Sequence, residues 1–279
     1  MNNLKITLIQ TTLHWENIDK NLEMFTQKLS QIDDETDLVV LPEMFNTGFS
    51  IKSIYLAEEI PDRPLEPGKS ASKSSKTLQW MANAAHEKKC VITGSLIIKE
   101  NGNYYNRLIW MSPDGSFKTY DKRHLFRFLN EHKYFTGGDN RIIVELNGWR
   151  ICPLICYDLR FPVWIRNRLV KKENIEMEYD VLVCIANWPE ARSYPWRILL
   201  LARAIENQCY VIGVNRVGKD GNDVVFSGDS SVVDAYGRVI SKTKPYDESI
   251  ETINLSYSKL QKFRESFPQG LDGDEFVVQ

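Results

Sequence analysis

Apolar and polar residues follow two kinds of period along this chain, and the two periods predict an alternating order of strands and helices. Residues 4–8 alternate between apolar and polar, which is typical of a half-buried strand. Residues 18–31 carry apolar side chains at helical spacing, and Asn17 just before them is a residue type that caps helices. Further strands are predicted at 38–41, 90–98, 105–111, 116–120, 142–146, 150–155, 181–186, 210–216, 230–234, 238–242 and 253–259, and further helices at 74–88, 163–172, 196–208 and 260–267.

Turn residues join several of these strands into hairpins. Pro113-Asp114-Gly115 and Asn147-Gly148 separate neighbouring apolar runs, and both combinations favour tight turns. Strands that alternate with helices and also form hairpins indicate an α/β fold with mixed sheets. Residues 51–73 contain several prolines without a clear period, so we predict a loop there, either a lid over a site or a surface excursion.

Length and composition favour one large domain. The chain has 279 residues, of which 43% are hydrophobic, and no internal repeat is evident. We expect a single domain over residues 1–279, with a core of about 5–242 and a C-terminal extension at 243–279.

Charge and cysteine usage narrow the class of protein. The 35 basic and 37 acidic residues leave a net charge of −2, so no overall field attracts nucleic acid or an anionic membrane. Five cysteines, most of them in apolar runs, fit a reducing compartment better than a disulfide framework. No signal-peptide pattern and no apolar run of about 18 residues is present. We therefore expect a soluble cytoplasmic protein with no nucleic-acid or membrane partner.

Cys156 stands where a predicted strand gives way to a turn. A thiol at a strand end, followed by a helix start, can serve as a nucleophile, because the backbone N–H groups there favour a thiolate and an oxyanion. The alternative is a small core residue, since cysteine is among the most buried residue types.

Two other predicted strands also end in charged residues. Glu43 follows the strand at 38–41, and Lys122 follows the strand at 116–120. A cysteine nucleophile needs a general base and a positive group near the developing oxyanion, and these residues supply one of each. Taken singly, a glutamate or a lysine is more often a solvated surface charge than a functional residue.

The segments around these three residues resemble the signature segments of the nitrilase superfamily of carbon–nitrogen hydrolases. They read LPEMFNTGF around Glu43, YDKRHLF around Lys122 and ICYDLRFP around Cys156. NEHKYFTGGD, which contains Glu131, and the block ANWPEARSYPWRILLLARAIENQCYVIGVNRVG are similar to further family segments. The resemblance extends from about residue 5 to about residue 241, and it is to the ω-amidase-like branch. Pro195 departs from that branch, in which a polar residue such as His is expected.

The resemblance implies a fold, an assembly and a reaction. The fold is a four-layer α-β-β-α sandwich with two mixed β-sheets, which often dimerises through its helical faces. The reaction is hydrolysis of the terminal amide of small 2-oxo or dicarboxylic acids, such as 2-oxoglutaramate and 2-oxosuccinamate, through a cysteine thioester and without a metal or other cofactor.

The family roles carry over to particular residues. Cys156 is implied as the nucleophile, Glu43 as general base and acid, and Lys122 as an oxyanion partner together with the backbone N–H of Tyr157. Glu131 is implied to position Lys122, the water or the amide, and a purely structural ion pair is its alternative.

Three further residues are candidates for the substrate pocket. Arg160, four residues after the nucleophile, could bind a substrate carboxylate, and its alternative is a structural ion pair with Asp158 or another acid. Phe49 and Trp188 could form the walls of the pocket, although aromatic residues at strand ends are often core residues.

Other functions stay open at this point. A Cys–His dyad with His124 or His132 leaves Glu43 and Lys122 without a role. A metal-dependent phosphoesterase needs clustered acidic and histidine ligands, and the sequence has no paired acidic motif for them. A catalytically idle interaction protein could keep the same fold. Nitrile hydrolysis, N-carbamoyl cleavage and amidotransfer use the same residues as amide hydrolysis, but we expect an amidase.

Overall fold

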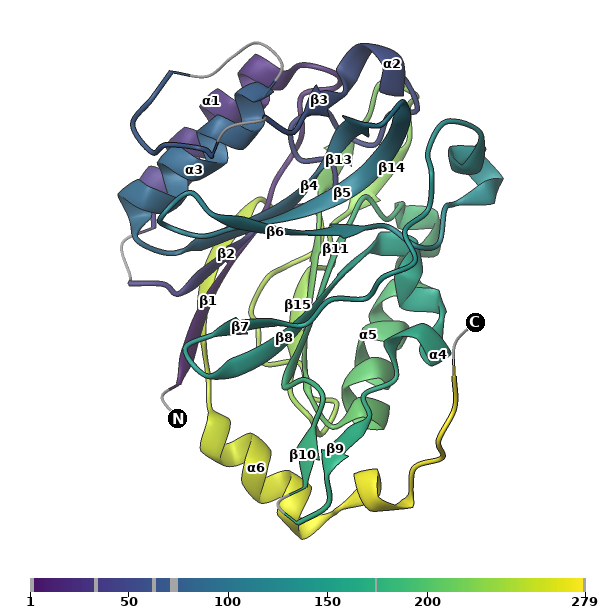
Figure 1. The fold of residues 1–279 in the computed structure, drawn as a ribbon. Helices are drawn as coiled ribbons and strands as arrows, with labels where there is room; N and C mark the ends of the chain where they lie inside the picture. Colours follow the sequence, from purple (N-terminus) through teal and green to yellow (C-terminus); the bar gives the residue numbers. More distant parts are fainter. Residues whose placement is uncertain (1–2, 33–34, 62–63, 71–74, 174, 278–279) are drawn as a thin grey trace.

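Two β-sheets pack face to face, and helices cover their outer faces (Figure 1). The structure, a computed structural model, describes residues 3–32, 35–61, 64–70, 75–173 and 175–277. In Figure 1, α1 and α3 lie on one side of the molecule and α5 lies on the other, with the sheets between them.

The first sheet is formed mainly by the N-terminal part of the chain. Its strands follow the order β16-β1-β2-β4-β5-β6, and β3 pairs with β4. β1, β2 and β4 pair in parallel, whereas β5, β6 and β16 run antiparallel to their neighbours. The bounds are β1 Leu4–Gln10, β2 Leu38–Val40, β3 Glu58–Glu59, β4 Val91–Glu100, β5 Asn103–Met111, β6 Phe117–Asp121, β16 Ser249–Leu255, α1 Ile18–Ser30 and α3 Lys76–Lys88.

The second sheet has the order β15-β12-β11-β8-β7. β8, β11 and β12 are parallel, and β7 and β15 are antiparallel edge strands. Two small antiparallel ribbons, β9 with β10 and β13 with β14, stand apart from it. The bounds are β7 Val144–Leu146, β8 Trp149–Ile155, β9 Leu169–Lys171, β10 Glu176–Met177, β11 Val181–Ala186, β12 Tyr210–Asn215, β13 Val217–Lys219, β14 Val225–Ser227, β15 Ser231–Val233, α5 Ser193–Asn207 and α6 Tyr257–Ser266.

The alternation of side chains in the strands explains the layering. In β2, Leu38 and Val40 belong to the apolar cluster shared with the second sheet, whereas Val39 between them packs in the cluster that includes α1 and α3. Successive side chains of a strand point to opposite faces, so an entirely apolar strand can be covered on both sides. The predicted four-layer sandwich with two mixed sheets is confirmed.

The prediction of a helix at 163–172 is wrong. Only α4, Pro162–Ile165, is helical, and the chain then forms the extended ribbon β9. Asn167 is buried between them, and its side-chain amide donates to the carbonyl of Tyr179 at 2.8 Å. Its side-chain carbonyl also accepts from the N–H of Tyr179 at 3.0 Å. These tertiary hydrogen bonds fix an extended backbone that the local apolar pattern does not reveal.

Other segments also differ in detail from the sequence-based expectation; for example, the strand predicted at 253–259 ends at Leu255, and α6 begins at Tyr257. The second arm of the hairpin predicted at 230–242 is reduced to a single bridge between Val233 and Val239. The predicted loop at 51–73 contains a short helix, α2 Ser53–Leu56, and strand β3. Buried Glu58 anchors this segment by accepting the backbone N–H of Thr77 at the start of α3. Residues 62–63 and 71–74, which complete the predicted loop and begin the predicted helix, lie outside the described part.

The segment after residue 242 contributes to the first sheet. β16 pairs with β1 at seven consecutive positions, from Leu4 opposite Leu255 to Gln10 opposite Ser249. Helix α6 follows at once, and its Leu260 is buried in the core. The predicted boundary at 242 is therefore not the edge of the sheet, and only residues 268–277 run as an irregular tail with one 3₁₀ turn.

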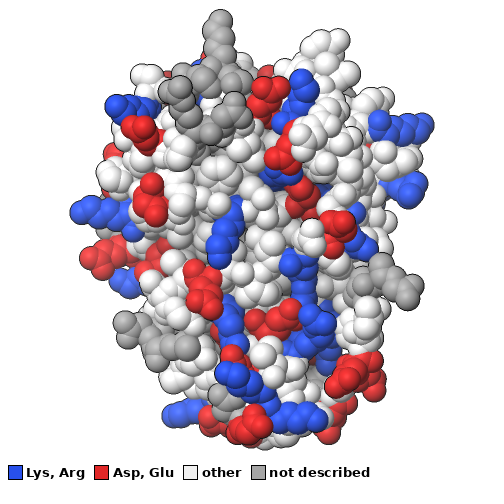
Figure 2. All heavy atoms as spheres, in the orientation of Figure 1, with Lys and Arg blue, Asp and Glu red and all other residues white. Residues whose placement is uncertain are grey.

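Charges of both signs are mixed over the surface seen in Figure 2. No helix in the described part of the chain is both long enough and apolar enough to cross a membrane.

Candidate active site

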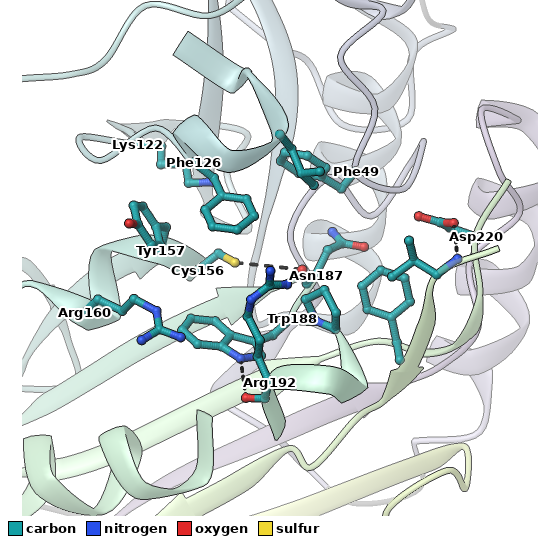
Figure 3. A pocket seen from close by; sticks show the side chains of 14 residues that line it. Phe49, Lys122, Phe126, Cys156, Tyr157, Arg160, Asn187, Trp188, Arg192 and Asp220 are labelled. Atoms are coloured by element: carbon teal, nitrogen blue, oxygen red, sulfur yellow. Dashed lines mark hydrogen bonds between the residues drawn. The ribbon is translucent and has the colours of Figure 1, made fainter. Parts of the chain in front are cut away.

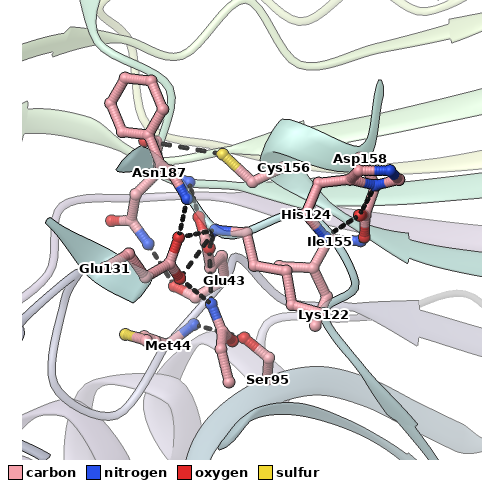
Figure 4. A network of polar contacts seen from close by, with 12 residues as sticks. Glu43, Met44, Ser95, Lys122, His124, Glu131, Ile155, Cys156, Asp158 and Asn187 are labelled. Carbon is pink, nitrogen blue, oxygen red and sulfur yellow. Dashed lines mark hydrogen bonds and ion pairs between the residues drawn. The ribbon is translucent and has the colours of Figure 1, made fainter. Parts of the chain in front are cut away.

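The charged residues singled out from the sequence meet at one end of the two sheets. Glu43 follows β2, Lys122 follows β6 and Cys156 follows β8. Asn187 joins them from the end of β11, and Glu131 lies in a 3₁₀ turn after β6. Four segments that are distant in sequence therefore converge on one site (Figure 4).

The turn that carries Glu43 is pressed against β4. The backbone N–H of Met44 donates to Oγ of buried Ser95 at 2.8 Å. At Gly94 an added Cβ would lie 2.7 Å from Phe45, far closer than van der Waals contact allows. A glycine at this position thus lets the turn approach the sheet and holds the Glu43 carboxylate at a defined place.

A buried cluster of one ammonium and two carboxylates forms the centre of the site. The side chains of Glu43 and Glu131 are 0% exposed and that of Lys122 is 1% exposed. Lys122 Nζ donates to Glu43 Oε1 at 2.9 Å and to both carboxylate oxygens of Glu131 at 3.0 Å. Glu131 also accepts the backbone N–H of Phe126 at 2.6 Å.

Further donors orient the Glu43 carboxylate. Asn106 Nδ2 donates to Oε1 at 2.8 Å, and the backbone N–H of Asn187 donates to Oε2 at 2.8 Å. The Asn187 side chain additionally donates to the backbone carbonyl of Glu43. Both carboxylate oxygens are therefore held in place, as a general base requires.

The electrostatics of the cluster keep Lys122 charged. Burial alone lowers the pKa of Lys122, but the negative charges of Glu131 and Glu43 outweigh it and raise that pKa well above its ordinary value. Burial raises the pKa of Glu131, although the Lys122 charge opposes this. Lys122 is thus a permanent cation at neutral pH.

Cys156 has an unusual backbone conformation. Its φ is +48°, in the left-handed region that side chains other than glycine rarely adopt. Such strain is found at functional sites because the surrounding structure must maintain it. The conformation places Sγ beside Asn187, with the carbonyl oxygen of Asn187 4.0 Å away.

The Cys156 thiol is protonated in the resting site. Burial, followed by the charge of Glu43, raises its pKa well above the ordinary value, and Lys122 only partly opposes this. A thiol of this kind becomes a nucleophile only when a neighbouring base removes its proton.

Asp158 connects the turn of Cys156 to the segment of Lys122. Its buried carboxylate accepts the backbone N–H of Ile155 at 3.2 Å and the backbone N–H of His124 at 2.9 Å. It also accepts the hydroxyl of Tyr120 at 2.8 Å. The ends of β8 and β6 are thereby joined through one carboxylate.

The histidines close to the motifs contact other groups. His124 Nδ1 lies 2.8 Å from Asp158, and its ring stacks on Phe161 with centroids 3.6 Å apart. The Nδ1 atom of His132 is buried, and it has no hydrogen-bond partner among the described residues. Neither histidine forms a described contact with Cys156, so the geometry does not favour the Cys–His alternative.

A cavity opens directly above Cys156 (Figure 3). The three predicted pocket residues, Phe49, Arg160 and Trp188, line it, and so does Tyr157, which the resemblance implies as an oxyanion donor. The remaining lining residues are Lys122, Phe126, Leu129, Cys156, Asn187, Pro189, Arg192, Asp220, Val224 and Phe226. Pro195, the departure from the ω-amidase-like pattern, lies in the first turn of α5 and is not among them.

The cavity continues outward into a larger one. The inner cavity has a volume of about 50 Å³, and the outer one, of about 550 Å³, shares Phe49, Leu129, Asp220 and Val224 with it. Residues 50–55 line the outer cavity, which places the start of the predicted lid beside the entrance. Motion of this segment stays a prediction.

Several residues of the site were not predicted from the sequence. Asn106 and Asn187 orient Glu43, and Phe126 and Arg192 line the cavity. The sequence contains a signal for both asparagines. Asn106 is a polar residue within a predicted apolar strand, and Asn187 directly follows an apolar run.

The described residues contain no group of three or more His, Cys, Asp or Glu side chains that could hold a metal ion. The site itself offers a carbonyl compound in the cavity the thiol of Cys156, the carboxylate base of Glu43 and the fixed cation of Lys122.

Comparison with known proteins agrees with this geometry. The sequence profile described as carbon–nitrogen hydrolase matches residues 5–265. The omega-amidase YafV of Escherichia coli K12 is 41% identical over 276 residues, which cover 99% of each chain. The 2-oxoglutaramate amidase of Bacillus subtilis is 35% identical over 255 residues, which cover 91% of this chain and 89% of the relative.

Solved structures show the same fold. A CN-hydrolase superfamily protein from Xanthomonas campestris, whose crystal structure carries an arsenic adduct in the active site, has a TM-score of 0.91 and 41% identity over the whole of both chains. A Saccharomyces cerevisiae member of branch 10 of the nitrilase superfamily has a TM-score of 0.80 and 22% identity, over 96% of this chain and 95% of that chain.

Proposed function

Because the chain belongs to the carbon–nitrogen hydrolase family, we propose that it is an ω-amidase. The reaction is hydrolysis of the terminal amide of small ω-amides of dicarboxylic or 2-oxo acids, such as 2-oxoglutaramate and 2-oxosuccinamate, to the acid and ammonia. The observation that carries the proposal is the buried Glu43–Lys122–Glu131 cluster next to Cys156, in a chain 41% identical to an omega-amidase over nearly its whole length.

In the first half-reaction Cys156 attacks the amide carbonyl. Glu43 takes the thiol proton as the S–C bond forms, because the raised pKa of Cys156 keeps the resting thiol neutral. Lys122 and the backbone N–H of Tyr157 stabilise the tetrahedral oxyanion, and loss of one such donor typically costs about 2.7–4 kcal/mol of barrier.

Collapse of this intermediate requires a proton on the leaving nitrogen. Glu43 returns the proton taken from Cys156, the C–N bond breaks, and ammonia leaves a thioester behind. In the second half-reaction Glu43 deprotonates a water molecule, which attacks the thioester. The C–S bond breaks, Glu43 gives this proton to the departing sulfur, and the acid is released. The Cys156 thiol and the Glu43 carboxylate are thereby both restored.

Glu131 is proposed to position Lys122. Its two oxygens hold Nζ from one side while Glu43 holds it from the other, so the ammonium cannot turn away from the oxyanion. It is a positioning residue in this mechanism, because Lys122 stands between it and the reacting atoms.

Arg160 is proposed to bind the carboxylate end of the substrate. Its alternative, an ion pair with Asp158 or another acid, is absent among the described residues, because Asp158 is occupied by Ile155, His124 and Tyr120. The guanidinium instead lies over the Trp188 ring, with 4.9 Å between its carbon and the ring centroid. A guanidinium without an acid partner in a cavity is suited to a carboxylate ligand.

The test is ammonia release from a panel of substrates. The panel contains 2-oxoglutaramate, 2-oxosuccinamate, glutamine, asparagine, a simple nitrile and an N-carbamoyl amino acid, with the Cys156→Ala variant as the control. We expect release from the 2-oxo amides that disappears in the variant and that persists in the presence of a metal chelator.

Other results of the ammonia-release assay would each contradict a different part of the proposal. Release from the nitrile or the N-carbamoyl compound alone would keep the chemistry and refute the ω-amide substrate. Release that survives Cys156→Ala would refute the nucleophile. A folded protein that releases ammonia from none of them would favour an interaction protein on the same fold.

Two expectations about the whole protein stay predictions. A homodimer and a cytoplasmic location follow only from the family resemblance and from composition. Sedimentation of the purified protein and cell fractionation would test them directly.

A further inference from the structure

A second guanidinium shares the cavity with Arg160. Arg192 lies in a 3₁₀ turn, Glu190–Arg192, just before α5, and its half-buried side chain lines the same cavity as Cys156. Figure 3 shows both arginine side chains reaching into the cavity around Trp188. Neither forms an ion pair with a carboxylate in the part of the chain that the structure describes.

Aromatic rings hold the Arg192 guanidinium in place. Its carbon lies 5.5 Å from the ring centroid of Phe126 and 4.8 Å from that of Phe128. The backbone carbonyl of Arg192 accepts Trp188 Nε1 at 2.7 Å, so the turn is tied to the cavity wall independently of the side chain. Stacking on rings leaves the in-plane N–H donors of a guanidinium available to a ligand.

The two arginines that line the cavity have no acid beside them to pair with in the described part of the chain. Lys122 is matched by the carboxylates of Glu43 and Glu131. Asp220, the one other acid among the lining residues, accepts the backbone N–H groups of its own hairpin at 2.8 and 3.0 Å and attracts buried Arg216. Arg160 and Arg192 are therefore left without an acid partner among the described residues.

We propose that Arg192 is a specificity-determining residue that, together with Arg160, binds the carboxylate and 2-oxo end of the substrate. This inference rests on the proposed ω-amidase function. A guanidinium only donates hydrogen bonds. A 2-oxo oxygen accepts such bonds, whereas the ammonium group of an amino acid at the same carbon offers more donors and a like charge. Arg192 thereby favours 2-oxo acid amides over the corresponding amino acid amides.

Four amides of similar length separate the contributions. 2-Oxoglutaramate carries both the carboxylate and the oxo group, glutaramate carries the carboxylate alone, butanamide carries neither, and glutamine carries an ammonium group in place of the oxo group. The variants are Arg192→Gln, Arg192→Lys and, as the matched control, Arg197→Gln. Arg197 lies five residues further on, within α5; it is exposed, pairs with Asp229 at 3.8 Å and is not a lining residue.

We expect Arg192→Gln to lower kcat/KM for 2-oxoglutaramate by about 10- to 100-fold, mainly through KM, because a charged hydrogen bond to the bound substrate is lost. Butanamide hydrolysis should change by less than about threefold. The ratio of 2-oxoglutaramate to glutamine activity should fall, and Arg192→Lys, which keeps the charge but not the planar fork, should be intermediate. Arg197→Gln should behave as the wild type.

Two results would overturn the inference. An equal loss for butanamide and 2-oxoglutaramate in Arg192→Gln would mean that Arg192 only supports Phe126 and Phe128. Unchanged kinetics on all four amides would mean that the side chain does not meet the substrate. In both cases an active wild type would leave the ω-amidase function standing.

A binding measurement tests Arg192 without turnover. 2-Oxoglutarate, the reaction product, is titrated by calorimetry into the Cys156→Ala protein with and without Arg192→Gln. We expect about 10-fold weaker binding when Arg192 is replaced. Equal affinities would refute the inference even if the wild type released no ammonia from any amide, so failure of the function and failure of the inference are distinguishable.

Discussion

Lys122 is a fully buried ammonium held between two fully buried carboxylates, and this imbalance of charge is the central physical feature of the site. Burying charged groups is costly unless they are paired and hydrogen-bonded. Here each carboxylate also accepts at least one backbone N–H, from Asn187 or from Phe126, which offsets part of that cost. The cluster is therefore better explained by function than by stability, because an apolar replacement of the same volume would avoid the cost altogether.

Replacing Glu131 by Gln separates its positioning role from a structural one. The amide oxygen can still accept from Lys122 or Phe126, but the charge that restrains the ammonium is gone. We expect kcat for the ω-amide to fall by about 100-fold with little change in KM, as for a misplaced catalytic group. Kinetics and the urea midpoint of the variant check this.

Glu145→Gln is the matched control for Glu131→Gln, because Glu145 is an exposed residue of β7. It should leave both kinetics and stability unchanged. If Glu131→Gln destabilised the protein but kept the wild-type kcat, Glu131 would be a structural ion-pair partner and its place in the mechanism would be lost.

At the scale of elements, the site depends on how the ends of β6 and β8 are joined. Asp158 accepts hydrogen bonds from both ends and lies two residues after the strained Cys156. A carboxylate can accept all of these donors at once, whereas an amide presents only one oxygen and adds two donors of its own. The junction therefore requires an acid at this position.

We expect Asp158→Asn to destabilise the protein by about 2–4 kcal/mol, because buried N–H and O–H donors lose their acceptor. Urea unfolding measures this loss. Activity should fall further than the unfolded fraction explains, since Cys156 and Lys122 lose their common support. Asp139→Asn, at an exposed position, should have neither effect; a wild-type midpoint for Asp158→Asn would contradict the connecting role.

At the scale of the whole molecule, the C-terminal segment completes the sandwich. Arg264 of α6 is fully buried, and its guanidinium pairs with buried Asp180 at 2.7 Å. Without α6 that carboxylate would lose its buried partner, and without β16 the edge of β1 would be uncovered.

Two truncations test this contribution. A chain that ends at residue 242 should fail to fold, as judged by circular dichroism and a cooperative urea transition. A chain that ends at residue 268, which lacks only the irregular tail, should keep the wild-type free energy of unfolding to within about 1 kcal/mol. A folded protein from the shorter chain would mean that the pairing of β16 with β1 contributes little.

Because the five cysteines are buried, the free energy of unfolding depends on pH in the alkaline range. Burial raises the pKa of Cys90 from 9.0 to about 11 and that of Cys152 to about 12. The unfolded chain releases these protons above pH 9 while the folded chain keeps them, so this contribution is fully present below pH 9 and is lost as the pH rises towards 11. We expect the free energy of unfolding to fall by about 1.4 kcal/mol per pH unit for each such thiol.

Urea midpoints at pH 8 and pH 10 under reducing conditions measure this dependence. Cys90→Ala is the informative variant, because Cys90 lies just before β4, away from the candidate site. The free energy of unfolding of this variant should fall less steeply with pH than that of the wild type, and the difference in slope is the contribution of one thiol. Equal slopes would show that the Cys90 thiol does not contribute.

Much of the fold, and the place of three candidate site residues at strand ends, could be predicted from local patterns in the chain. The catalytic roles of these three residues are implied by the family resemblance and stay predictions. The period-2 and helical patterns located most elements, and Glu43, Lys122 and Cys156 each follow a strand, where a side chain can leave the sheet. Residues 163–172 could not be assigned correctly, because the hydrogen bonds of Asn167 to distant Tyr179 override the local apolar spacing.

The remaining features of the site depend on contacts between segments that are distant in sequence, which only the tertiary structure determines. The burial of Glu131, the orientation of Glu43 by Asn106 and Asn187, and the presence of Arg192 in the cavity all depend on side chains that only the packed sheets bring together. Local patterns report which face of an element is apolar. They do not report which polar side chain from elsewhere in the chain will face it, because that depends on how the two sheets and their connecting turns pack.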